Sequence, residues 1–165
     1  MRRLLLTGPP AAGKTTIGRL IAESRHYGAF IDVDDVRHMI VGGHAAPWSA
    51  EQGAHQQRLG VINACALARN FVDNGIEVVV ADVLTNDTAA LYRELLPTVL
   101  VLELVVDFQE AQRRSEQRPL YLTPDEFPAL HDQQAEFTAS DRRVNLSQLS
   151  EQETTILVRE TRLSL

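Results

Sequence analysis

The chain has 165 residues, a length that favours a single domain around one hydrophobic core. Its 44% hydrophobic and 23% charged residues exclude a disordered, collagen-like or coiled-coil protein. The net charge of −6, the single cysteine and the short apolar runs argue against nucleic-acid binding, a disulfide framework and a membrane span. We therefore expect a cytoplasmic domain without a nucleic-acid or membrane partner.

Short apolar runs alternate along the chain with segments of helical periodicity. In chain order, strands are expected at 2–7, 29–31, 77–82, 99–106 and 143–146. Helices are expected from near Gly13, from the second strand to Ile40, from Ser49 to about Asn74, and over 87–96, 108–118, 124–138 and 151–163. Four of these helices are preceded by a capping-box signature, at Ser49, Asp107, Thr123 and Ser150.

The order of these elements indicates the fold class. Strands that alternate with helices form a parallel sheet, and right-handed crossovers place the helices on both of its faces. The sequence therefore predicts an α/β protein, a single three-layer α/β/α domain over 1–165 with a five-stranded, mainly parallel sheet.

The segment from Gly8 to Thr15 matches the phosphate-loop pattern G-x-x-x-x-G-K-[ST] at every fixed position and lies between a strand and a helix. Such a loop wraps phosphates with its backbone N–H groups, and its glycines permit the close approach. Lys14, the only lysine, would reach the β- and γ-phosphates, and the Thr15 hydroxyl would bind Mg²⁺. The predicted nucleotide-binding residues are Gly8, Pro9, Pro10, Ala11, Ala12, Gly13, Lys14, Thr15 and Thr16.

This pattern predicts a nucleoside triphosphate site, against the alternative of a chance glycine-rich turn. GTPases of the Ras type read guanine with an Asn-Lys-x-Asp stretch, which this chain lacks because its one lysine lies in the phosphate loop. ATP with Mg²⁺ is therefore the predicted pair of cofactors.

Acidic residues follow two of the predicted strands. Asp82 ends the third strand, where it would hold Mg²⁺ directly or through water; the alternative is an acid at a helix start or in a solvated turn. Asp32, Asp34 and Arg37 follow the second strand, and Asp32 would assist in metal binding. A carboxylate there can accept the proton of an acceptor hydroxyl, and an arginine can orient the acceptor. The alternative is an ordinary capped helix.

With these motifs, the chain resembles the small P-loop kinases of the nucleoside-monophosphate-kinase-like superfamily, among them shikimate and gluconate kinases, chloramphenicol phosphotransferase and polynucleotide kinase. The resemblance implies a P-loop NTPase fold with a helical lid at about 113–130, Asp34 as the general base and Arg37 as a substrate-side arginine. Arg113, Arg114 and Arg118 are similar to the lid arginines that neutralise the transferring phosphoryl group, although an ordinary charged helix would look the same.

The resemblance leaves the acceptor open, because the chain lacks the Gly-Gly-Gly and the spaced arginines with which shikimate kinases bind a carboxylate. Trp48 is a candidate for the acceptor pocket and equally for a core or hinge role. For His44 a solvated loop position is favoured over a place in the acceptor pocket, and 142–145 would border adenine as in related kinases. We predict an ATP-dependent kinase for a hydroxyl of a sugar, metabolite, nucleoside or antibiotic. The alternatives are a nucleic-acid or nucleotide 5′-kinase, and a P-loop ATPase switch without an acceptor.

Overall fold

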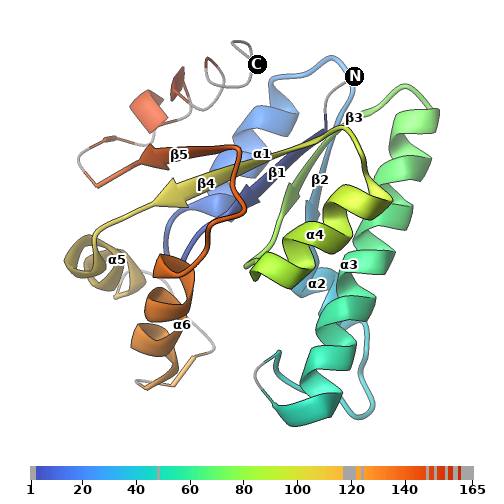
Figure 1. Cartoon of the computed structure of the whole chain (residues 1–165). Coiled ribbons are helices and arrows are strands. Elements are labelled where there is room, and N and C mark those ends of the chain that lie inside the picture. The colour runs from blue at the N-terminus through green and yellow to red at the C-terminus, as the bar shows by residue number, and fades with distance from the viewer. Residues whose placement is uncertain are drawn as a thin grey trace.

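Five parallel strands form a sheet in the order β2-β3-β1-β4-β5 (Figure 1). The computed structural model describes residues 3–47, 49–116, 122–123, 125–147, 149–150, 152–154, 156–157 and 160. The strands are β1 (Arg3–Thr7), β2 (Gly28–Asp32), β3 (Glu77–Ala81), β4 (Val99–Val105) and β5 (Arg142–Asn145). β1 and β4 are apolar along nearly their whole length because helices cover both faces of the sheet. The predicted five-stranded, parallel sheet is confirmed.

Helices pack on both faces of the sheet and complete the three predicted layers. They are α1 (Lys14–Glu23), α2 (Val33–His38), α3 (Ala50–Asp73), α4 (Asn86–Leu95), α5 (Phe108–Ser115) and α6 (Glu126–Ala135). On one face, Ile17 and Ile21 of α1 pack against alternate residues of β1, β3 and β4. On the other, Cys65 of α3 and Tyr92 of α4 join the second core cluster. Each cluster removes apolar side chains from water on its own side of the sheet.

Two of the four predicted capping boxes form. Thr123 with Glu126, and Ser150 with Glu153, exchange reciprocal side-chain to backbone hydrogen bonds. Ser49 and Asp107 make no side-chain cap, which corrects the prediction; Glu110, the expected partner of Asp107, is instead bonded to arginines of its own helix.

The remaining helix boundaries differ from prediction by a few residues. α4 begins one residue earlier than expected, behind a capping box of Thr85 and Thr88 that the sequence pattern does not reveal. α6 ends at Ala135, three residues before the predicted end at 138. The predicted helix 151–163 lies largely outside the described residues. Among the helices described, none is both long enough and apolar enough to cross a membrane.

The carboxyl ends of the parallel strands lie along one edge of the sheet, and α6 lies on that side (Figure 1). Gln134 of α6 is buried and donates a hydrogen bond from Nε2 to the carbonyl oxygen of Leu84 at 2.7 Å, just beyond β3. The hydroxyl of Thr7, the last residue of β1, lies 3.4 Å from Gln134 Oε1 and accepts a hydrogen bond from Leu84 N. This buried network fixes α6 over the sheet edge from which the phosphate loop departs.

Candidate active site

The phosphate loop runs from the end of β1 to the first turn of α1. Gly8 has φ 143°, and a Cβ there would lie 2.2 Å from the backbone oxygen of Leu104, so only glycine fits. Ala11 and Gly13 also have positive φ, and α1 begins immediately afterwards at Lys14. The positive end of the α1 dipole thus faces the loop, which is the arrangement that binds phosphate.

Lys14 folds back over its own loop. Its Nζ donates hydrogen bonds to the carbonyl oxygens of Gly8 at 2.7 Å and Pro9 at 2.9 Å. Burial lowers the pKa of Lys14 to about 8, and the neighbouring carboxylates of Asp34, Asp32 and Asp82 only partly offset this. Because the unfolded chain binds this proton more tightly, the protonated Lys14 costs stability below pH 8, and the cost fades as the pH rises toward 10.5.

Thr15 and Asp32 form a pair of oxygen atoms at the start of α1. The Thr15 hydroxyl donates to Asp32 Oδ2 at 3.0 Å, and Asp32 Oδ1 caps α2 by accepting from Asp34 N at 3.1 Å. Burial raises the pKa of Asp32, opposed by the Thr15 hydrogen bond. In the described part of the chain, no three His, Cys, Asp or Glu residues are placed to hold a metal ion together, so a cation here needs phosphate and water as further ligands. That donor set suits Mg²⁺, which prefers few protein oxygens.

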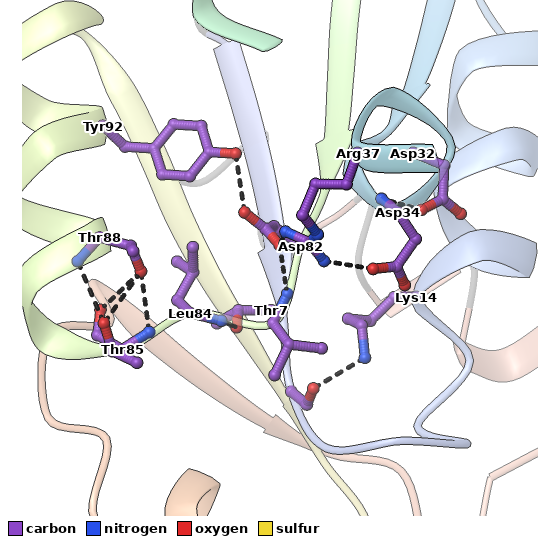
Figure 2. A network of polar contacts seen from close by, with 12 residues as sticks. Thr7, Lys14, Asp32, Asp34, Arg37, Asp82, Leu84, Thr85, Thr88 and Tyr92 are labelled. Atoms are coloured by element: carbon purple, nitrogen blue, oxygen red, sulfur yellow. Dashed lines mark hydrogen bonds and ion pairs between the residues drawn. The ribbon is translucent and has the colours of Figure 1, made fainter. Parts of the chain in front are cut away.

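Arg37 lies buried between two carboxylates (Figure 2). Its Nη1 donates to Asp82 Oδ1 at 3.0 Å, and its Nη2 donates to Asp34. Burial alone would lower the pKa of Arg37, but Asp82 and Asp34 outweigh it and hold that pKa above its ordinary value. Asp34 stays half open, with 62% of its side chain exposed. Arg37 therefore binds Asp34, the predicted general base, from the buried side of the site.

Asp82 anchors Arg37 in turn. Its side chain is 1% exposed, Oδ1 also accepts from Val83 N at 2.8 Å, and Oδ2 accepts from the Tyr92 hydroxyl at 3.0 Å (Figure 2). Burial raises the pKa of Asp82, while Arg37 lowers it. With both oxygens bonded and no exposed surface, this geometry argues against the predicted Mg²⁺ contact of Asp82. Its position is that of a residue that orients Arg37.

We expect Tyr92→Phe to lower the free energy of unfolding by about 1.5–3 kcal/mol, because a hydrogen bond to a buried carboxylate is lost. Denaturant unfolding followed by circular dichroism measures this. The matched control is Tyr27→Phe, which removes the same hydroxyl from a side chain that is 65% exposed. Equal stabilities of the two variants would contradict the network of Tyr92, Asp82 and Arg37.

Two of the predicted lid arginines, Arg113 and Arg114, are bound to one glutamate. Arg113 Nη2 and Arg114 Nε each donate to Glu110 Oε1 at 2.7 Å, and Arg114 Nη2 donates to Leu146 O at 3.0 Å. Hydrogen bonds from Arg113 and Arg114 lower the pKa of Glu110 to about 2. Both arginines line the cavity but would have to exchange partners to meet a phosphate. Arg118 lies outside the described residues, and its role stays a prediction.

A cavity of about 950 Å³ joins these groups. The lining residues include Pro10 to Ile17 of the phosphate loop and α1, Asp34, Asp35, Arg37, His38, His44, Gln57, Glu110, Arg113, Arg114, Leu149, Ser150 and Thr154. His44 lines this cavity, whereas Trp48 is outside the described residues. The segment 142–145 does not contribute; Arg143 instead bonds Glu103 and Phe137 O. The segment predicted to border adenine thus lies outside this cavity, and Leu149, Ser150 and Thr154 line it instead.

No protein-family model and no curated protein sequence matches the chain. Solved structures do. A sugar kinase from Janibacter sp. HTCC2649 superimposes with a TM-score of 0.73 at 16% identity, over 99% of this chain and 95% of that one. A shikimate kinase from Acinetobacter baumannii in complex with shikimate has a TM-score of 0.66 at 22% identity, over 98% of this chain and 93% of that one. A gluconokinase from Sinorhizobium meliloti 1021 has a TM-score of 0.62 at 18% identity, over 98% of this chain and 92% of that one.

The chain has the P-loop kinase fold. This confirms the resemblance drawn from the phosphate loop, and the structural neighbours are small-molecule kinases. At such identities the likeness establishes the fold, and the acceptor must be argued from this chain's own residues.

Three features of the candidate site have no recognisable signature in the sequence. Tyr92 looks like any apolar position of an amphipathic helix. Gln56 holds the loop before α3 by bonding Ala45 N and Gly43 O, yet polar residues are common on helices. His131 of α6 reaches Pro10 O at 3.2 Å across 121 residues of sequence, a contact that only the tertiary fold creates.

Proposed function

We propose that the chain is an ATP- and Mg²⁺-dependent kinase that transfers the γ-phosphoryl group to a hydroxyl of a small molecule. The observation that carries this proposal is one cavity bounded by the phosphate loop on one side and by the half-exposed carboxylate of Asp34 on the other. A nucleotide switch has no use for a base held beside the phosphate site, whereas phosphoryl transfer to an alcohol needs one.

Each residue has a distinct task in this reaction. The loop amides and Lys14 bind the phosphates, and Thr15 with Asp32 would hold Mg²⁺, which neutralises phosphate charge when bound. Asp34 accepts the proton of the acceptor hydroxyl. The acceptor oxygen bonds to the γ-phosphorus as the bond from that phosphorus to ADP breaks. Arg37 fixes the direction of the Asp34 carboxylate. An arginine of α5, released from Glu110, would neutralise the transferring group.

We expect Mg·ATP binding at pH 8 to take up about half a proton, because Lys14 is about half protonated at its pKa of about 8 and bound phosphate raises that pKa. The phosphates themselves are already ionised, since their second pKa is about 6. Calorimetric titration in two buffers of different ionisation enthalpy measures the uptake. The Lys14→Met variant is the control and should show no uptake. Absence of binding heat in the unaltered chain would contradict the nucleotide site.

Kinase activity is distinguished from a nucleotide switch by the fate of the phosphoryl group. ADP release is measured with and without candidate alcohols, and mass spectrometry identifies any product heavier by one phosphoryl group. ADP formation that depends on an alcohol supports the proposal. ATP hydrolysis that no alcohol accelerates, with no phosphorylated product, contradicts it and favours the switch.

A further inference from the structure

The α2 side of the cavity is where an acceptor of the proposed kinase would meet Asp34. Its charged and polar lining residues are Asp34, Asp35, Arg37, His38, His44 and Gln57. Among the described residues that line the cavity, the other cations lie elsewhere: Lys14 in the phosphate loop, and Arg113 and Arg114 on α5. Whether the α2 side can bind an anion therefore depends on Arg37.

Arg37 is already occupied by carboxylates. Its Nη1 is bonded to the buried Asp82 at 3.0 Å and its Nη2 to Asp34. Gly60 of α3 closes over its aliphatic stem, since a Cβ there would lie 2.8 Å from Arg37 Cγ. Turning the guanidinium toward an anionic ligand would leave Asp82 charged, buried and without its ion-pair partner, which is strongly unfavourable. Arg37 is thus a fixed support for Asp34 and no longer a free anion-binding group.

The other groups on this side accept hydrogen bonds or carry no fixed positive charge. Asp35 is exposed and has no ion-pair or hydrogen-bond partner for its carboxylate in the described part of the chain. The rings of His38 and His44 lie 4.8 Å apart, and Gln57 offers an amide. Asp34 and Asp35 both line the α2 side, whereas Arg37, the only arginine or lysine among its described lining residues, is shared between Asp34 and the buried Asp82. The α2 side therefore carries the charge of Asp35 without a paired cation beside it.

We propose, building on the kinase function above, that the acceptor is an alcohol without a carboxylate or phosphate group, either neutral or bearing an amine. An anionic acceptor would lie beside carboxylates of the same charge, and this repulsion strongly disfavours its binding. Hydroxyl and ammonium groups can instead donate hydrogen bonds to Asp34 and Asp35. The acceptor would then differ in charge from shikimate, the carboxylate bound in one of the similar structures.

Acceptors matched in skeleton test the charge rule. D-glucitol, 1-amino-1-deoxy-D-glucitol and D-gluconate share an open six-carbon chain and differ mainly in the charge at C1, and further alcohols are paired with carboxylate or phosphate counterparts of the same size. With saturating Mg·ATP at pH 8, where an ordinary imidazole is uncharged, kcat/KM is measured from acceptor-dependent ADP release and confirmed by product mass. We expect phosphorylated members to be neutral or amine-bearing, with kcat/KM at least about 100-fold above their anionic counterparts.

The other outcomes separate the two proposals. Preferred phosphorylation of the anionic counterparts would overturn the charge rule and leave the kinase function intact. Failure of every alcohol, in a chain that binds Mg·ATP, would count against the kinase function and with it the charge rule.

A variant tests the same rule by gain of function. Gln57→Arg adds a cation to the α2 side and should raise the rate with an anionic acceptor, relative to its neutral counterpart, by about tenfold. Ala54→Arg is the matched control, because it adds the same charge on an exposed position of α3 that does not line the cavity. An unchanged ratio in Gln57→Arg, or an equal change in both variants, would contradict the assignment of the acceptor to this side.

Discussion

Asp34→Asn is expected to reduce acceptor-dependent turnover by about 10²–10⁴-fold, the usual contribution of a positioned general base. The amide keeps the size of the carboxylate and can still accept a hydrogen bond from Arg37, but it cannot take the hydroxyl proton. The Asp34 carboxylate acts on the phosphate site only through its charge beside Lys14, so the calorimetric affinity for Mg·ATP should be retained or increased in the variant. Loss of turnover with retained nucleotide affinity assigns Asp34 to the chemical step.

Asp73→Asn provides the matched control for this substitution. It makes the same chemical change at an exposed carboxylate near the end of α3, remote from the cavity. Its turnover should equal that of the unaltered chain. Full activity of Asp34→Asn would contradict the assignment of Asp34 as the general base. Asp32 and Asp35 would then be tested in its place.

The phosphate loop is predictable from sequence because its chemistry is local. Eight consecutive residues supply the backbone N–H groups, the lysine and the hydroxyl, and the glycines at positions 8 and 13 adopt the positive φ that the pattern implies. The alternation of strands and helices likewise determines the sheet, because buried parallel strands must be apolar along their length. The strand β2 was recognised as 29–31 and extends by one residue at each end.

The pairing of Arg37 with Asp82 is not local, and the sequence could not reveal it. The two residues are 45 positions apart, and they meet because β2 and β3 are neighbours with Asp32 opposite Ala81. The sequence placed both at the same sheet edge but assigned Asp82 to a metal and Arg37 to the acceptor. Their burial, and the hydrogen bond from the Tyr92 hydroxyl to Asp82, show that Arg37 and Asp82 pair with each other.

Local signatures also fail where a better partner competes. The predicted capping box at Asp107 requires the Glu110 side chain to turn back toward the helix start. Two arginines, three and four residues further along the helix, draw it the other way through charged hydrogen bonds. At Thr123 and Ser150 the glutamate three residues further on accepts from the backbone N–H at the helix start, and the boxes form.

Asp82→Leu is expected to lower the free energy of unfolding by about 3–5 kcal/mol, because Arg37 would keep its charge in a buried position with only the half-exposed Asp34 as a partner. Denaturant unfolding measures the loss. Arg93→Met, which breaks the half-exposed ion pair with Asp141 at 2.9 Å, is the control and should cost no more than about 1 kcal/mol.

The double variant Arg37→Met with Asp82→Leu separates stability from function. Replacing both members of a buried ion pair by apolar side chains is often neutral for stability, so the double variant should be clearly more stable than Asp82→Leu alone. Acceptor-dependent turnover should nevertheless remain low, because nothing then fixes the Asp34 carboxylate toward the acceptor. A double variant that regains both stability and turnover would show that Arg37 and Asp82 serve the fold alone. Regained stability without turnover places the pair in the positioning of the base.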